Sequence, residues 1–382
     1  MRALLMLMAM ATTVTPALAQ EHRQDAGGAI IVTGSALAET SKKLKDCVAR
    51  HCSPKDDISA TLVHAESQYL AGDYDGAWTT LSRSNNRNAR YSAEYPQEVA
   101  NLQRAYGRLT DIIGLPENGR VLQIFAFDTL RDSFGANDAR TLNQQLATGD
   151  YSLGTGRLTR AMDVYRRVER KAQAAGQLEV QGRAMLRQAG IYSTLATRDR
   201  GYASLARANI DRIAQTTAPE LATYRTAAEI LRARLTASRG GAASIDKAVA
   251  GLSGKSVSVP IEVYSPPLLG LDPGVGTLAP ANPEWIDVRY RIEPSGRVED
   301  IEQLNSSEKI TGDWAKQVRA SLAKRRYAPV DPGADGEGLV RTERFSLVFD
   351  ITRETQSRVL GRNGNPRIVT LDLADKPEQG AL

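Results

Sequence analysis

The chain has 382 residues, 42% of them hydrophobic and 24% charged, which is ordinary for a folded globular protein of two or three domains. Its formal net charge of +5 comes from arginines dispersed along helical patterns, so solvated helix surfaces explain the charge better than a nucleic-acid site does. Weak attraction to anionic surfaces is the minor alternative. Beyond the first residues, no stretch is apolar enough to predict a membrane-spanning helix.

The first residues have the pattern of a secretory signal. A positive charge at the second residue precedes the apolar run Ala3–Ala11, which is shorter than the ~20 residues that a spanning helix needs. Pro16 then precedes a small-x-small sequence that ends at Ala19. We therefore predict that residues 1–19 are a signal peptide, cleaved between Ala19 and Gln20. Because no cysteine directly follows the apolar run, we expect no lipid anchor, and the predicted location is the periplasm.

Residues 20–56 are predicted to be a flexible leader with a short extended segment. The β-branched residues of that segment favour a strand and its glycine ends the strand; its members are Ile30, Ile31, Val32, Thr33 and Gly34. The segment resembles the TonB box of outer-membrane receptors, which implies binding by strand addition. An equal alternative is a tail whose apolar part packs on the protein's own surface.

Two cysteines, Cys47 and Cys52, lie in this leader. In an unbroken helix their Cα atoms would be roughly 8–9 Å apart, beyond the reach of a disulfide. Pro54 predicts that a helix that begins at Ser41 ends near Arg50, so that Cys52 can fold back. An oxidising compartment then favours a structural disulfide. A metal site that includes His51 is a weaker interpretation because no fourth ligand is nearby, and a redox pair is weaker still.

Residues 57–251 predict a succession of helices with short breaks. A helical hairpin cannot bury its apolar face alone, so we predict an α-solenoid, with a compact bundle as the alternative. The expected helices are Ile58–Gly72, Tyr74–Ser84, Ala93–Gly114, Arg120–Ser133, Ala136–Thr148, Arg157–Ala175, Leu178–Thr197, Tyr202–Thr216, Pro219–Ser238 and a short one that ends at Gly251.

The sequence around Gly72-Asp73-Tyr74 and Ala77 resembles a tetratricopeptide repeat. In such repeats the small residue lets two helices approach and the tyrosine packs between them. Imperfect copies occur at Ala161 and Ala206, which are 84 (161 − 77) and 45 (206 − 161) residues further on, instead of the 34 of a standard repeat. The resemblance implies a surface that binds peptides or proteins.

Residues 256–352 predict a small α+β domain. Strand patterns cover Ser256–Tyr264, Ile286–Ile292 and Arg297–Leu304, although a helical spacing fits the last of these almost as well. A helix with Trp314, Val318 and Leu322 on one face follows, and Arg341–Ile351 is the last strand. The overall fold class is therefore an α+β multidomain protein: an all-α helical-repeat domain followed by a small domain with the order strand, strand, helix, strand.

This small domain resembles the TonB C-terminal domain family. The matching residues are Gly296 and Val298 after the first turn, Arg326, Tyr327 and Pro329 after the helix, and the apolar last strand. The resemblance covers about a quarter of the chain, and an unrelated α+β domain is the alternative. It implies that an extended partner segment adds as a strand to an exposed sheet edge. That edge would comprise Arg344, Phe345, Ser346, Leu347, Val348 and Phe349.

Residues 353–382 are predicted to be a C-terminal tail. Asn363-Gly364 has the sequence of a hairpin turn. Arg367–Leu373 is therefore either one further strand of the sheet or part of a mobile tail. If it joins the sheet, it can cover the predicted binding edge.

No sequence motif indicates an enzyme. The three histidines, His22, His51 and His64, are not in a nucleophile or zinc motif, and no Walker loop or distinctive carboxylate pair is present. We predict no catalytic residue, no cofactor and no metal.

The predicted function is that of a periplasmic adaptor or scaffold. Its partners would be envelope proteins or extended peptide segments, outer-membrane receptors among them, and neither nucleic acid nor a small-molecule cofactor. The chain departs from the energy-transducing members of the TonB family because it lacks a retained anchor and a long proline-rich spacer. The alternatives are an accessory energy transducer for receptor transport, if the signal is retained, and an envelope-associated repeat protein whose C-terminal sheet is purely structural.

Overall fold

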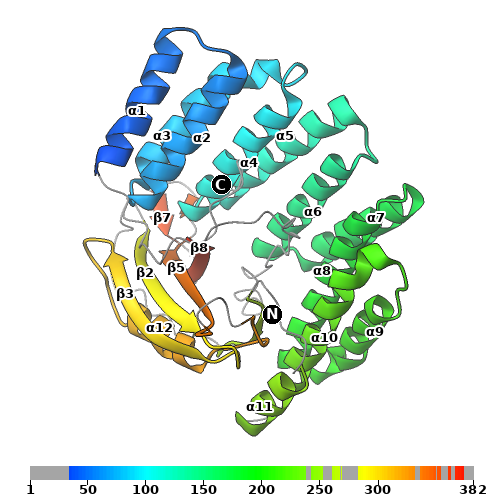
Figure 1. Cartoon of the computed structure of the whole chain (residues 1–382). Coiled ribbons are helices and arrows are strands. Elements are labelled where there is room, and N and C mark those ends of the chain that lie inside the picture. The colour runs from blue at the N-terminus through cyan, green and yellow to red at the C-terminus, as the bar shows by residue number, and fades with distance from the viewer. Residues whose placement is uncertain are drawn as a thin grey trace.

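A computed structural model describes residues 34–237, 242–252, 260–266, 268, 283–331, 336–349, 351–353, 360–362 and 366–373. Helices follow one another along an arc, and a small C-terminal domain with an antiparallel sheet lies between the two ends of that arc (Figure 1). The expected order of a helical part followed by a small α+β domain is thus confirmed. The predicted signal peptide, its cleavage site and residues Ile30–Thr33 lie outside the described residues.

The α-helices of the arc each pack mainly on their neighbours in the chain. They are α1 Gly34–Ala49, α2 Pro54–Leu70, α3 Tyr74–Asn88, α4 Pro96–Ile112, α5 Pro116–Phe134, α6 Ala139–Gly154, α7 Leu158–Ala174, α8 Leu178–Arg198, α9 Ala203–Ala214, α10 Ala222–Ala237 and α11 Ala242–Ala250. Short 3₁₀ turns cover η2 Ala89–Tyr91, η3 Arg200–Tyr202 and η4 Pro219–Leu221. Helices α4 and α5 begin at prolines rather than at the predicted Ala93 and Arg120, since proline at the first helical position needs no N–H partner.

A glycine turn recurs along the arc at a regular interval. Gly72, Gly114 and Gly156 have φ of 81°, 92° and 85°, and they lie 42 residues apart (114 − 72 and 156 − 114). At each turn the residue after the glycine donates its N–H to the carbonyl five residues earlier, at 2.7–2.9 Å, which closes the preceding helix. The hairpins therefore repeat every 42 residues rather than 34.

This interval explains the uneven copies found in the sequence. Ala77 and Ala161 are two intervals apart, and Gly119 stands at the skipped position between them. A Cβ added to Gly119 would lie 2.6 Å from the carbonyl oxygen of Gly107, so α4 and α5 approach too closely for any side chain there. The sequence analysis missed this copy of the repeat because its small residue is glycine, whereas the other copies have alanine.

The described part of the leader is helical from Gly34 onward, so α1 begins seven residues before the predicted helix start at Ser41, in a stretch that we expected to be flexible. Gly34 begins α1 instead of ending a strand. The inner positions of α1 are Leu37, Leu44 and the buried Cys47, a spacing that places them on one helical face against α2.

Cys47 and Cys52 form a disulfide in the structure, with their Cα atoms 5.2 Å apart. Helix α1 ends at Ala49, and His51 takes the left-handed φ of 52°, which turns the chain back toward α1. Ser53 then caps α2 by accepting from the N–H of Asp56.

His64 is buried on α2, where its Nδ1 lies 3.0 Å from the hydroxyl of Thr40. Burial, together with the charge of Lys45, lowers the pKa of His64 below its usual value of 6.5. The unfolded chain therefore binds a proton at a pH where the folded chain does not, so stability decreases as the pH falls through 6.5.

We expect the substitution His64→Gln to reduce this pH dependence, because glutamine does not titrate. The measurement compares urea midpoints at about pH 7.5 and about pH 5.5 for the wild type and the variant. An equal loss of stability on acidification in both proteins would contradict the assignment to His64.

The C-terminal domain contains the strands β1 Glu262–Tyr264, β2 Glu284–Ile292, β3 Val298–Ser306, β4 Arg326–Tyr327, β5 Leu339–Val348, β6 Ile351–Arg353, β7 Leu360–Arg362 and β8 Arg367–Asp372, and the helix α12 Trp314–Lys324. The main sheet is antiparallel with the order β3-β2-β5-β8, while β1 pairs with β4 and β6 pairs with β7. The segment Arg297–Leu304, for which a helical spacing fitted almost as well, is thus a strand. Residues 256–259 of the first predicted strand lie outside the described part of the chain.

The two faces of the main sheet pack against different parts of the chain. One face, with Ile286, Val288 and Phe345, packs against Trp314 and Leu322 of α12 to make the domain's own core. The opposite face carries the side chains that alternate with these and meets the helical arc. Both faces of the central strands are therefore buried within this chain.

Candidate functional site

The predicted binding edge is wrong, because β5 lies inside the sheet. It pairs with β2 on one side and with β8 on the other, in a register that places Arg344 opposite Leu371 and Ser346 opposite Val369. Phe349 follows directly after the strand. The chain's own tail therefore occupies the hydrogen-bonding edge that we had expected a partner segment to use.

The outer strand β3 is a poor substitute for that edge. It exposes the carboxylates Glu299, Asp300 and Glu302. Asp300 has a φ of 51°, and the register between β2 and β3 shifts at irregularities. Edge charges and local bulges both oppose the addition of another strand to β3. The other outer strand of the sheet is β8, which pairs with β5 alone.

The residues of the predicted family motif lie together at the turn between β2 and β3. The carbonyl of Gly296 accepts from the N–H of Tyr327 at 2.8 Å, and a Cβ at Gly296 would lie 2.1 Å from the Tyr327 oxygen. Val298 is in the core, and Arg326 and Tyr327 form β4, with Pro329 two residues beyond. Gly296 is required by this close approach and by its φ of 82°.

Arg344 joins the sheet to the helical arc. Its guanidinium donates to both carboxylate oxygens of Asp287 on β2, at 2.6 and 2.8 Å, and to the carbonyls of Tyr69 and Leu70 at 2.6 and 2.8 Å. Its side chain is 2% exposed and lies 3.7 Å from the ring centre of Trp285. Burial alone lowers the pKa of Arg344, but the hydrogen bonds to Asp287 and the nearby Tyr74 raise it overall, so the side chain is charged.

The turn between α2 and α3 provides the docking surface for this contact. Trp285 packs on Gly72, where an added Cβ would lie 2.8 Å from the indole nitrogen. The hydroxyls of Tyr74 and Ser346 lie 3.4 Å apart. The Gly72-Asp73-Tyr74 motif, which predicted a helical repeat, is thus also the place where the sheet docks, a role that sequence analysis did not identify.

A second arginine binds the end of α4 in the same way. Arg367 on β8 donates to the carbonyl of Asp111 at 3.1 Å and to its carboxylate at 2.9 Å. The last carbonyls of a helix lack partners within it and carry partial negative charge. Arg344 and Arg367 therefore complete the C-terminal ends of α2 and α4.

The other side of the C-terminal domain contacts the far end of the arc. Val263 of β1 and Ala328 pack with Ile230 of α10 and Val249 of α11 in one buried cluster. Arg234 of α10 also donates to the carbonyl of Glu262. The domain thus holds both ends of the arc, as Figure 1 shows.

A buried network of charges lies beneath the strand β5 on the α12 side. Glu343 accepts from Arg325 at 3.1 Å and lies 3.1 Å from Arg341, which in turn pairs with Asp372 of β8 at 2.8 Å. Tyr290 and Tyr327 share a hydrogen bond of 2.7 Å beside this network, and burial raises the pKa of both phenols. These charges are matched to one another, which is the arrangement of a structural network.

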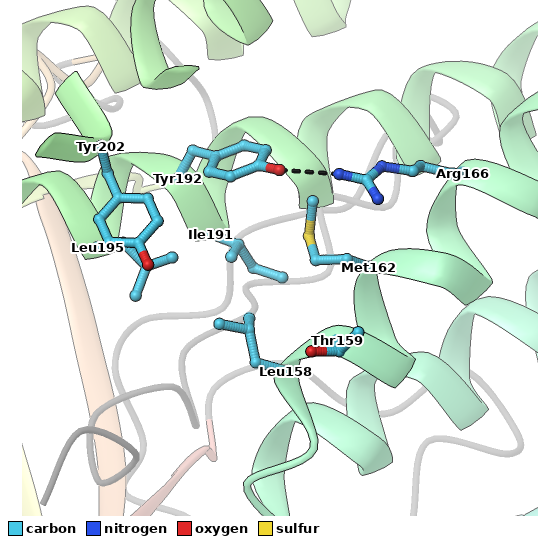
Figure 2. Close-up of a pocket in the computed structure, with 8 residues that line it drawn as sticks. All are labelled: Leu158, Thr159, Met162, Arg166, Ile191, Tyr192, Leu195 and Tyr202. Atoms are coloured by element: carbon cyan, nitrogen blue, oxygen red, sulfur yellow. Dashed lines mark hydrogen bonds between the residues drawn. The ribbon is translucent and has the colours of Figure 1, made fainter. Parts of the chain in front are cut away.

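A pocket opens in the helical arc between α7 and α8 (Figure 2). Its volume is about 190 Å³, and it is partly open to solvent. Figure 2 shows the side chains of Leu158, Met162 and Ile191 converging, with Arg166 donating to the hydroxyl of Tyr192 at 2.9 Å along one side. The complete lining is Leu158, Thr159, Met162, Arg166, Ile191, Tyr192, Leu195 and Tyr202.

This pocket was not predicted from the sequence. Its residues come from the start of α7, the end of α8 and the 3₁₀ turn η3, so that only the stacking of the hairpins brings them together. Met162 and Ile191 also belong to the buried core of the arc, and their helical spacing predicted burial alone.

Among the described residues, no three or more His, Cys, Asp or Glu side chains are grouped so that they could hold a metal ion. The described helices also include none with both the length and the apolar character needed to cross a membrane.

No protein-family model and no curated protein matches this chain. Among solved structures, the chain is similar to BtubC (BKLC) from P. vanneervenii, with a TM-score of 0.42 and 12% sequence identity. The match covers 64% of this chain and 97% of that one. A similarity of this size does not bear on the function.

Proposed function

We propose that this protein is a scaffold that binds other proteins, with the helical arc as the binding part and the C-terminal domain as its brace. The observation that supports it best is the apolar pocket between α7 and α8, which is open while the predicted strand edge is covered. This assignment keeps the expectation of a periplasmic adaptor with repeat hairpins of the tetratricopeptide type. It transfers binding from the TonB-like domain to the helices.

The size of the pocket favours a side chain over a cofactor. Sites for small molecules of drug size occupy about 300–1,000 Å³, whereas an apolar cavity of about 150 Å³ accepts a benzene ring. The volume of about 190 Å³ therefore suits one leucine or aromatic side chain. Because burying such a side chain contributes about 1.5–3 kcal/mol, closing the pocket should weaken binding by roughly 10- to 100-fold.

The substitution Thr159→Trp tests this function. Thr159 is an exposed rim residue, so an indole there should block the pocket without disturbing the core. The matched control is Thr236→Trp at an exposed position of α10, outside the pocket lining. We expect quantitative crosslinking in envelope extracts to recover the same partners with the wild type and the control, and at least about tenfold less with Thr159→Trp. Equal recovery by all three proteins would contradict the proposal.

The covered strand β5 favours a purely structural C-terminal sheet over the accessory transducer. Arg344 and Ser346, which we expected to meet a partner, contact α2 and α3 of the same chain. The transducer alternative also requires that the N-terminal signal is retained as an anchor. N-terminal sequencing of the mature protein distinguishes these alternatives, because a start near Gln20 is expected for the scaffold and a retained Met1 for the transducer.

A further inference from the structure

The positive charge of the protein is concentrated around the pocket. Residues 157–215, from the residue before α7 to the residue after α9, contain 12 Arg and Lys but only 5 Asp and Glu, a net charge of +7 (12 − 5). Since the whole chain has a net charge of +5, the remaining residues sum to −2 (5 − 7). The net positive charge of the protein thus comes from this one part of the arc, although arginines occur along the whole chain.

Several of these cations lie at or beside the pocket. Arg166 is part of the lining, and Arg170 is exposed one helical turn further along α7. Arg200 is exposed in η3, two residues before the lining residue Tyr202. The same stretch of α7 has two acidic residues: Asp163 lies 3.7 Å from Arg166, and Glu169 pairs with Arg212 of α9 at 3.3 Å. The rim of the pocket is therefore cationic, while its floor is apolar.

This combination selects a particular kind of ligand. A free inorganic anion would use the arginines but gain nothing from Leu158, Met162 and Ile191. A purely apolar ligand would gain nothing from the rim. A peptide segment that presents one large apolar side chain among carboxylates uses both, because the side chain fills the pocket while the carboxylates face the arginines.

We propose that the pocket between α7 and α8 binds an acidic segment of a partner protein, anchored by a single leucine or phenylalanine side chain. This inference rests on the proposed scaffold function and specifies the chemistry of its partner. The arginine rim accelerates association and sets the charge preference, and the apolar floor supplies the anchor.

Short fluorescein-labelled peptides of equal length test the inference by fluorescence anisotropy with the full chain. One peptide carries a phenylalanine flanked by glutamates, a second has lysines in place of the glutamates, and a third has alanine in place of the phenylalanine. We expect only the first to bind strongly, with each of the others at least about tenfold weaker. Raising the salt concentration should weaken the binding of the first peptide, because salt screens the charges of the rim.

Charge reversals locate the site on the protein. Arg170→Glu and Arg200→Glu should each weaken the acidic peptide by about threefold to tenfold. The matched control Arg83→Glu, at an exposed position of α3, should leave binding unchanged. Thr159→Trp should abolish binding of the acidic peptide.

The outcomes separate this inference from the function on which it rests. If Thr159→Trp removes partners from extracts but all peptides bind alike or not at all, the scaffold function stands and the acidic specificity is overturned. The acidic specificity of the pocket would also be overturned if the acidic peptide bound equally well after its phenylalanine was replaced by alanine and to the Thr159→Trp protein. Such binding would indicate only a diffuse cationic surface. An RNA oligonucleotide that binds more tightly than the acidic peptide and competes with it would assign the surface to nucleic acid instead.

Discussion

The substitution Arg344→Met should destabilise the protein by about 3–5 kcal/mol, the range for breaking one side of a buried ion pair. Asp287, whose side chain is 6% exposed, would keep its charge without a partner. The carbonyls of Tyr69 and Leu70 would also lose the donor that Arg344 provides at the end of α2, although Tyr69 would keep the N–H of Gly72. Denaturant unfolding measures the loss, and hydrogen exchange at the end of α2 and in the turn at Gly72 should increase.

Two further variants make this expectation specific. Arg289→Met removes a neighbouring arginine whose pair with Glu302 is partly exposed, so its cost should stay below about 1 kcal/mol. The double variant Asp287→Leu with Arg344→Met removes both charges and should recover part of the stability lost by the single change. If Arg344→Met is no more harmful than Arg289→Met, Arg344 does not hold the sheet to the arc.

A chain that ends at Asn365, without β8, should self-associate more than the full chain does and should also lose stability. The truncation exposes the β5 edge over Glu343–Val348 and removes the contacts of Arg367 with Asp111 and of Asp372 with Arg341. An open strand edge pairs readily with other strands. Size-exclusion chromatography with light scattering should therefore show a larger average mass, relative to the mass of one chain, for the truncated protein than for the full chain.

A chain that ends at Leu373 is the matched control for this truncation, because it retains β8 and the hydrogen bond from Leu373 to the carbonyl of Thr342. We expect it to behave as the full chain does. A synthetic peptide of residues 366–373, added to the shorter chain, should restore the association state of the full chain by filling the edge. A shorter chain with the same association state and the same stability as the full chain would show that β8 contributes little to closing the sheet.

The local structure of this protein was largely predictable. The amphipathic periods located the helices of the arc, and the alternating patterns located β2, β3 and β5, because these signals depend on residues within a few positions of one another. The exceptions are also local. Gly34 begins a helix, and the repeat interval was misread because Gly119 replaces the expected alanine.

The sites depended on contacts between distant parts of the chain. Arg344 and Tyr69 are 275 positions apart in the sequence, and Arg367 and Asp111 are 256 apart. A sequence pattern shows that Arg344 alternates with apolar residues, which is typical of a solvated face, but it does not show that a helix end covers that face. The same holds for β5, which has the pattern of an apolar strand whether it is at an edge or inside the sheet.

By itself the sequence determined which segments are helix or strand, the order of the helical part and the small α+β domain, and the small domain's apolar core, because local propensity and hydrophobic period decide these. The tertiary structure alone decided that β8 covers β5, that two arginines bind the ends of α2 and α4, and that an apolar pocket with a cationic rim opens between α7 and α8. Each of these features depends on contacts between segments that are distant in the sequence, and such contacts are determined only by the packing of the whole fold.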